Sequence, residues 1–261
     1  MLLVVDVGNT NICAGVYDGK KLIVDWRFST DRTKTSDEFG VILRSFFDYS
    51  NVKMSDVHGA IISSVVPPVT IPLVRMFKRY FGIKPLIVGP GLKSGISVKY
   101  DNPKEVGADR IVDAAGAIYK YAHLGKPMIL LDFGTANTYC ALLPNGEYLG
   151  GAIAPGINIA TEALYTRTAK LPRIELIKPD HVICRNTVNS MQAGCIYGHI
   201  GQMECIIRKM KSELGGDAIV IATGGMSGTI CSGSDVVDII DPNLTLDGLM
   251  VLYEKNAKSD K

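Results

Sequence analysis

The sequence has little of what marks several classes of protein. It contains one tryptophan and four histidines, and its net charge of +2 is spread along the chain without a basic block. A nucleic-acid partner is therefore not expected. The histidines show no metal-ligand spacing, so a zinc site is not expected either. No apolar run approaches the roughly 20 residues that a membrane span needs, which gives no reason to expect a membrane partner.

Signals for secretion are also scarce. The chain is apolar from residue 2, lacks a basic lead and passes directly into a polar loop, so we expect no signal peptide. The six cysteines form no C-x-x-C pair and lie mostly in apolar runs. Cysteines of this kind are typical of reduced, buried side chains. They predict a cytoplasmic protein.

The sequence does contain enough hydrophobic residues (47%) for sizeable cores, and it contains an internal repeat. In the first copy an apolar strand ends in Asp6-Val7-Gly8-Asn9-Thr10-Asn11. Gly8 lets the backbone turn so that successive N–H groups can point at a phosphate. Asp6, at the carboxyl end of the strand, could hold Mg²⁺ or a water molecule bound to it. An ordinary turn after a buried strand gives the same pattern, so one copy alone decides nothing.

The second copy starts close to the middle of the chain. Residues 127–131 are again apolar and run into Asp132-Phe133-Gly134-Thr135-Ala136-Asn137-Thr138. Each copy continues with a second β-like run, a polar turn and a third strand. This duplication predicts an α/β fold with two similar domains, residues 1–125 and 126–261. Two phosphate loops across one cleft are a way to hold a nucleotide polyphosphate, which indicates ATP chemistry.

Several helix starts can be predicted from capping signals. Thr35 and Glu38 form a capping box. Thr70 is expected to cap a helix that has Pro72 in its first turn. Thr187 is expected to cap the longest helix, which continues to about residue 214.

Two further segments carry a structural and a functional interpretation. Asp109-Arg110 opens a helix, where the helix dipole alone favours a carboxylate; the functional interpretation is a fixed carboxylate beside a fixed guanidinium. The small residues at 150–156 and the turn Thr223-Gly224-Gly225 allow a backbone to approach a ligand closely. At the turn, the expected ligand is an adenosine. A strand that ends in a plain turn would look much the same.

Four motifs in this order form a recognisable constellation. They are Asp-x-Gly-Asn-Thr at 6–10, Gly-Ala-Asp-Arg at 107–110, Asp-Phe-Gly-Thr-Ala at 132–136 and Gly-Gly-x-Ile-x-Pro-Gly at 150–156. Together they resemble the type III pantothenate kinase family over nearly the whole chain. That family belongs to the actin, sugar-kinase and heat-shock-ATPase superfamily, with two ribonuclease-H-like domains and a nucleotide cleft between them. The resemblance implies a homodimer that uses ATP to convert pantothenate to 4′-phosphopantothenate, the first step of coenzyme A biosynthesis.

The resemblance also implies roles for individual residues. Asp109 would be the base for the primary hydroxyl of pantothenate, and Asp132 would lie at a monovalent cation, K⁺ or NH₄⁺. ATP, with Mg²⁺ held at Asp6 through water, would be bound by Asp6, Val7, Gly8, Asn9, Thr10, Asn11, Ile12, Cys13 and Thr135. Pantothenate would be bound by Tyr100, Gly107, Ala108, Asp109, Arg110 and Thr187.

Two positions depart from the family pattern. Asn137 and Cys140 stand where the family usually has threonine and aspartate, and the missing carboxylate at 140 predicts an altered cation preference or ATP affinity. Two other functions stay open: a non-catalytic regulatory relative of the same fold, and a superfamily kinase that acts on another small alcohol or a carboxylate. The Asp109-Arg110 pair and the lack of a basic patch argue against the first.

Overall fold

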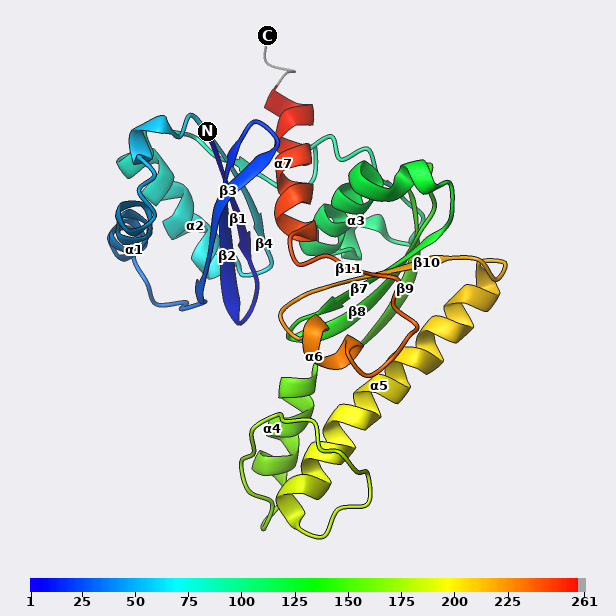
Figure 1. Ribbon diagram of the computed structural model, residues 1–261. Coiled ribbons are helices and arrows are strands. Elements are labelled where there is room, and N and C mark those ends of the chain that lie inside the picture. Colours follow the sequence, from blue (N-terminus) through cyan, green and yellow to red (C-terminus); the bar gives the residue numbers. More distant parts are fainter. Residues whose placement is uncertain (258–261) are drawn as a thin grey trace. The chain divides into compact units, whose positions relative to one another are not determined.

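The computed structural model describes residues 1–257, which form two compact units. Unit 1 contains Met1–Tyr121 and the residues from Asn243 onward, and unit 2 contains Ala122–Pro242. Figure 1 shows the helices and strands of both units. The predicted division after residue 125 lies close to the first boundary, but the structure places the last helix in unit 1 and not with the second half of the chain.

The sheet of unit 1 has the strand order β3-β2-β1-β4-β5, with β1 in the centre. The strands of this unit are β1 (Leu2–Val7), β2 (Asn11–Asp18), β3 (Lys21–Ser29), β4 (Gly59–Ser64), β5 (Leu86–Ile87) and β6 (Ser97–Val98). β1 pairs antiparallel with β2 and parallel with β4. Side chains of a strand alternate between the two faces of the sheet, so the unbroken apolar run of β1 requires cover on both faces.

Helices provide this cover. They are α1 (Ser36–Tyr49), α2 (Pro67–Met76), α3 (Ala108–Tyr121) and α7 (Leu244–Ala257). Leu3 and Val5 belong to a core cluster with side chains of α1 and α2, whereas Leu2 and Val4 belong to a cluster with side chains of α3 and α7. Short 3₁₀ or π turns lie at Met54–Asp56, Phe77–Phe81 and Pro103–Glu105 in unit 1 and at Ala122–Leu124 in unit 2.

Unit 2 repeats the topology of unit 1, as the duplicated motifs predict. Its own strands follow one another in the order β11-β10-β7-β8-β9, and they are β7 (Met128–Phe133), β8 (Ala136–Leu142), β9 (Glu147–Pro155), β10 (Ile219–Thr223) and β11 (Ile239–Ile240). β7 pairs antiparallel with β8 and parallel with β10, as β1 does with β2 and β4. The helices are α4 (Ile157–Arg167), α5 (Thr187–Glu213) and α6 (Ser227–Cys231), and α5 packs Ile196, Ile200 and Met203 into the core of this sheet.

The last helix, red in Figure 1, explains why the division of the chain differs from the prediction. α7 contributes Leu249 and Leu252 to the core cluster that contains Leu2 of β1. A side chain at Gly59 of β4 would collide with the ring of Tyr253. α7 therefore completes the core of unit 1. The sequence of this segment does not indicate which sheet the helix covers.

The predicted helix starts are confirmed in one case and wrong in two. The capping box of Thr35 and Glu38 is present at the start of α1. α2 begins at Pro67 rather than after Thr70, because Pro67 and Pro68 supply the φ angle that the first turn needs. The N-cap of α5 is Asn186 and not Thr187, since the Asn186 side chain accepts the N–H of Asn189 at 2.8 Å. Within residues 1–257, no helix has the length and apolar character needed to cross a membrane.

Candidate active site

The loop that follows β1 lies at the carboxyl end of this central strand of unit 1. Asp6 is half-buried, is paired with Cys13 on β2 and lies opposite Ser63 on β4, and residues 9–11 are exposed. The Gly8 N–H donates to the carbonyl of Asn11 at 3.0 Å, and a Cβ at Gly8 would lie 3.1 Å from that oxygen. The loop is thus a tight turn whose polar residues face solvent beside a carboxylate.

A residue that sequence analysis missed holds this loop in place. The hydroxyl of Thr30 donates to the Gly8 carbonyl at 2.7 Å, and the Thr30 N–H donates to the Thr10 carbonyl at 2.9 Å. Arg32 reaches the Asn9 side chain at 3.3 Å. A polar residue directly after the third strand of the repeat was the only available signal, because nothing local indicates that the end of β3 lies beside the turn after β1.

Cys13, in the predicted phosphate-binding segment, carries an uncharged thiol. Burial raises the pKa of its thiol above the ordinary value, although the nearby Arg27 guanidinium opposes this effect. The thiol is therefore protonated at neutral pH and places no negative charge beside Asp6.

The corresponding loop of unit 2 is packed more closely. The Gly134 N–H donates to the Ala136 carbonyl at 3.3 Å, as Gly8 does to Asn11, and the Gly156 N–H donates to the Thr135 carbonyl at 3.1 Å. A Cβ at Gly156 would lie 2.5 Å from the Gly134 carbonyl oxygen. The glycine that ends the motif at 150–156 is therefore required by contact with the loop.

Asp132 lies below the turn that follows β10. Asp132 is half-buried and pairs with Thr223. Gly224 has a φ of +91°, and a Cβ there would collide with the Asp132 carboxylate and lie 2.6 Å from the Phe133 nitrogen. Close approach of two backbones accounts for the glycine at 224. The expected approach of an adenosine to this turn remains a prediction.

The two departures from the family pattern lie inside unit 2. Cys140 is buried, pairs with Leu130 on β7, and its sulfur accepts the Tyr148 hydroxyl at 3.1 Å. Asn137 is buried too, and its Nδ2 has no hydrogen-bond partner among the described residues. Both belong to β8 rather than to the turn at Gly134 and Thr135, which is half-buried. Their predicted effect on the cation or on ATP remains a prediction.

The segment at 100–110 forms the third part of the candidate site. Asp109 lies in the first turn of α3, and its Oδ1 accepts the Arg110 N–H at 2.8 Å. The Arg110 guanidinium donates to the Tyr100 hydroxyl at 3.2 Å and to the Glu105 carbonyl at 3.1 Å. The Asp109 carboxylate lies so close to Gly107 that a Cβ there would collide with it. The structure thus brings together four of the residues predicted to bind pantothenate.

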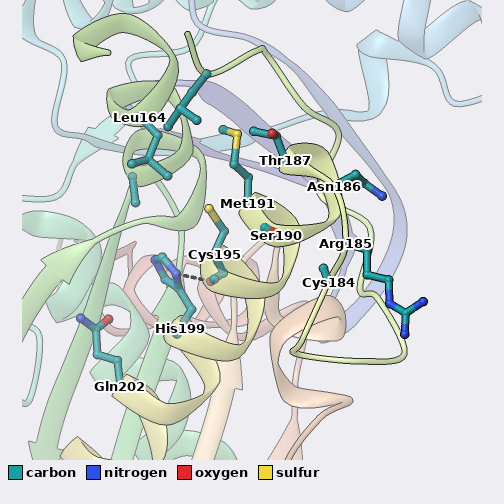
Figure 2. A pocket seen from close by; sticks show the side chains of 14 residues that line it. Leu164, Cys184, Arg185, Asn186, Thr187, Ser190, Met191, Cys195, His199 and Gln202 are labelled. Carbon is teal, nitrogen blue, oxygen red and sulfur yellow. Dashed lines mark hydrogen bonds between the residues drawn. The ribbon is translucent and has the colours of Figure 1, made fainter. Parts of the chain in front are cut away.

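Thr187 belongs to unit 2, where it lines a groove of about 880 Å³. Figure 2 shows that the groove is bordered by α5, by Leu164 of α4 and by the segment around Cys184. Thr187 is exposed, at the first position of α5. The first N–H groups of a helix lack partners inside the helix and favour anions, which suits the start of α5 to a carboxylate.

The donor set at the two acidic loops fits a divalent metal with ATP. Asp6 and Asp132 are carboxylates at strand ends, the type of oxygen ligand that Mg²⁺ binds. Ser63 is fully buried opposite Asp6, and its Oγ has no hydrogen-bond partner among residues 1–257. No group of three or more His, Cys, Asp or Glu side chains suited to a metal occurs in that range.

Several solved structures share the fold of this chain. The chain aligns with a Campylobacter jejuni protein assigned to the Baf family of transcriptional activators (TM-score 0.60, 16% identity, 98% of this chain and 99% of that one). It also aligns with the EutJ ethanolamine utilization protein of Carboxydothermus hydrogenoformans (TM-score 0.53, 12% identity, 96% and 89%) and with an inorganic polyphosphate/ATP-glucomannokinase of Arthrobacter sp. strain KM (TM-score 0.50, 11% identity, 99% and 98%). These likenesses show the fold alone, the two-domain, ribonuclease-H-like fold.

Sequence relatives narrow this class. The profile of the family described as type III pantothenate kinase matches residues 2–209. A type III pantothenate kinase of Geobacillus kaustophilus is 54% identical over 258 residues, 99% of both chains, and one of Geobacillus thermodenitrificans has the same identity and coverage. The chain belongs to the type III pantothenate kinase family. This membership supports the predicted kinase over a regulatory relative and over a kinase for another alcohol.

Proposed function

We propose that this chain performs the reaction of its family with Asp109 and Arg110, at the start of α3. The chain is an ATP-dependent pantothenate kinase, which transfers a phosphoryl group to an alcohol and forms 4′-phosphopantothenate in the first step of coenzyme A biosynthesis. One observation carries the assignment of the base: Asp109 stands in the first turn of α3, beside an arginine whose guanidinium is oriented by Tyr100 and Glu105. A carboxylate and a cation are thereby fixed side by side.

The proposed steps use these groups in turn. Arg110 is proposed to pair with the carboxylate of pantothenate. Asp109 accepts the proton of the primary hydroxyl as that oxygen bonds to the γ-phosphorus and the bond to the ADP oxygen breaks. Phosphoryl transfer passes through a loose transition state, so a base need only orient the oxygen and take the proton late.

We assign binding of ATP to the two acidic loops. Residues 6–13 are proposed to contact the phosphates, with Thr135 as a further ATP contact. The kinase uses a divalent metal with ATP, and we place Mg²⁺ at Asp6 through water. When bound, Mg²⁺ neutralises charge on the phosphates. We place a monovalent cation, K⁺ or NH₄⁺, at Asp132, where the tight turn at Gly224 leaves no space for a side chain above the carboxylate.

A homodimer through the groove of unit 2 is part of the proposal. α4 buries only Ile157 and Thr161. Leu164 lines the groove, and large apolar side chains are exposed in β9, in α4, between α4 and α5 and at the start of α5: Ile153, Ile159, Leu164, Tyr165, Ile177, Val182, Ile183 and Val188. Ile183 is 92% exposed. A second copy of the chain would remove this apolar surface from water. All six cysteines are free thiols, in accord with a cytoplasmic location.

The test of the dimer uses two matched substitutions. Ile183→Lys places a charge on the proposed interface, whereas Val41→Lys places one on α1 of unit 1, where Val41 is 62% exposed. Light scattering coupled to size exclusion should show a monomer for Ile183→Lys and a dimer for Val41→Lys. Dimers of both variants would contradict the proposed interface.

The test of the catalytic assignment is Asp109→Asn with Asp101→Asn as its control, since Asp101 is an exposed carboxylate in the preceding loop. ADP release that depends on pantothenate should fall at least about 100-fold for Asp109→Asn and stay near normal for Asp101→Asn. Calorimetry should still show pantothenate binding to Asp109→Asn. Near-normal turnover by this variant would remove Asp109 from the role. A panel of other alcohols, assayed with and without potassium, tests the substrate and the cation.

A further inference from the structure

α3, which carries Asp109 and Arg110, packs backbone to backbone against α7. A Cβ at Gly116 would lie 2.5 Å from the Leu244 carbonyl oxygen and 3.2 Å from the Gly248 nitrogen. A Cβ at Gly248 would collide with the Val112 carbonyl. These two glycines let the helix axes approach more closely than side chains would allow. The contact fixes the separation of the helices.

A hydrogen bond between polar side chains lies at the same contact. Asp113 is only 6% exposed, and its Oδ1 accepts the Thr245 hydroxyl at 2.7 Å. A buried carboxylate is costly unless it is hydrogen-bonded, so this bond is favoured over any arrangement of α3 that breaks it. Because the bond is directional, it opposes rotation and sliding of α3 on α7, which apolar packing restrains less strictly.

Asp113 lies one helical turn after Asp109. Four residues along an α-helix correspond to about 6 Å of rise and place the two side chains on nearly the same face. A small rotation of α3 would therefore move the Asp109 carboxylate and the Arg110 guanidinium. We propose that Asp113 and Thr245 are positioning residues for catalysis, which hold α3 in the register that Asp109 needs. This inference rests on the role proposed above for Asp109.

A second polar contact, which joins the start of α7 to the last turn of α3, offers a control. Asp247 of α7 accepts the Tyr17 hydroxyl at 2.7 Å and the Lys120 ammonium at 2.8 Å. Lys120 is in the last turn of α3, far along the helix from Asp109. Removal of the Tyr17 hydroxyl should weaken the attachment of α7 without turning the first turn of α3.

The experiment compares three variants of the full chain. Thr245→Val removes the donor to Asp113 at nearly constant volume, Thr245→Ser keeps it, and Tyr17→Phe removes a hydrogen bond of α7 elsewhere. For Thr245→Val we expect kcat to fall roughly tenfold, with less than a twofold change in KM for pantothenate, because misplacement of a reacting group by a fraction of an ångström slows the chemical step. Thr245→Ser should restore most of kcat, and Tyr17→Phe should keep kcat within twofold of the parent.

Stability is measured in parallel by thermal unfolding. If Thr245→Val does not fold, the double variant Asp113→Leu with Thr245→Val replaces both polar partners by apolar groups, and the same fall in kcat is expected. Normal kcat in the folded Thr245→Val variant or in the double variant would overturn the proposal. An equal fall for Tyr17→Phe would show a general loss of stability and would overturn it as well.

Asp109→Asn separates this result from failure of the proposed function. If Asp109→Asn is inactive and Thr245→Val has normal kcat, the base assignment stands and the positioning role is wrong. If Asp109→Asn turns over normally, the base assignment itself fails, whatever Thr245→Val does.

Discussion

The two acidic loops follow equivalent strands, β1 in unit 1 and β7 in unit 2, but different groups hold them in place. β1 and β7 share a burial pattern in which five residues are buried and the aspartate is half-buried, and each runs between an antiparallel and a parallel neighbour. The loop after β1 is fastened by the side-chain hydroxyl of Thr30 as well as by its backbone N–H. The loop after β7 is fastened by backbone groups, the N–H of Gly156 and the N–H of Met226, which donates to Phe133 at 3.3 Å.

This difference follows from what comes after the parallel neighbour strand. At the end of β4 the Ser64 hydroxyl accepts the Val66 N–H at 3.1 Å, and Val66 is the N-cap of α2. The chain therefore turns away from the sheet without a glycine. β10 continues into Gly224, whose positive φ folds the backbone over Asp132. The same topology can therefore leave Asp6 beside an open loop and place the backbone of Gly224 over Asp132. An open loop suits a ligand as large as a triphosphate, and a covered one suits a small ion.

The largest expected effect concerns the two aspartates themselves. Asp6→Asn should lower kcat by at least about 100-fold, because it removes a charge that Mg²⁺ and the phosphates require in the transition state. Asp132→Asn should act mainly by abolishing activation by potassium. ADP release measured over a range of potassium chloride concentrations distinguishes the two. If Asp6→Asn lost only its potassium response and Asp132→Asn lost turnover, the assigned roles would be reversed.

The next effect sharpens the contrast between a covered and an open loop. Gly224→Ala combines an unfavourable positive φ with contacts of 2.6 Å and 2.7 Å to the Phe133 backbone, and should cost about 2–4 kcal/mol of unfolding free energy. Gly8→Ala meets only the Asn11 carbonyl at 3.1 Å, and should cost about 1 kcal/mol. Urea unfolding of both variants provides the comparison. Equal losses would mean that the second loop is not the more tightly packed one.

A smaller effect is expected from the side chain that fastens the first loop. Thr30→Val removes the hydroxyl that binds the Gly8 carbonyl and should raise KM for ATP about fivefold, which corresponds to about 1 kcal/mol for one hydrogen bond. Thr30→Ser keeps the hydroxyl and serves as the control. Steady-state kinetics with ATP as the varied substrate measure the change. An unchanged KM in Thr30→Val would indicate that the loop is ordered by ATP itself.

The smallest effect concerns alkaline pH and separates the cores of the two units. Burial raises the pKa of Tyr139 to about 12 and that of Cys231 to about 11, both in the core of unit 2. Both groups ionise more readily when unfolded, from ordinary values of 10.0 and 9.0. Their contribution to stability is complete below pH 9 and is lost as the pH rises through 11 to 12. The buried cluster beneath α1 and α2 has no such group, and in unit 1 the Arg27 guanidinium opposes the effect of burial on the pKa of Cys13.

Two probes can follow the units separately. Trp26, the single tryptophan of the chain, stacks on Phe46 in unit 1 and reports that unit by fluorescence. Labelling of Cys231 in a pulse at pH 8, after incubation at higher pH in urea, reports unit 2. Above pH 10 the labelling transition should move to lower urea concentration before the fluorescence transition does. The opposite order would contradict the assignment of the alkaline sensitivity to unit 2.

Much of the fold and part of the site could be predicted from sequence, because both depend on short segments. The duplicated strand and acidic loop and the capping box at Thr35 each involve residues close together in the chain or a local pattern. Thr30 and Thr245 could not be predicted in the same way. Their partners, Gly8 and Asp113, lie far away in the sequence, and only the packing of strands and helices brings them together.

The helix starts show the same limit on a smaller scale. Thr70 has the chemistry of a cap, but Pro67 and Pro68 start the helix earlier, and the Thr70 hydroxyl bonds the Ser64 hydroxyl at 2.7 Å instead. Asn186 and Thr187 are both good caps, and only the backbone conformation decides between them. Local propensity therefore predicts that a helix starts nearby, while neighbouring residues select the position.

The place of α7 has a consequence for how the chain is made. The strands of unit 1 leave the ribosome early in synthesis, but the helix that covers one of their faces is translated after all of unit 2. Until then Leu2 and Val4 lack the partners that α7 supplies. A nascent chain must therefore carry an incomplete first unit through most of its translation, and a stop codon before residue 244 would damage the beginning of the protein as well as its end.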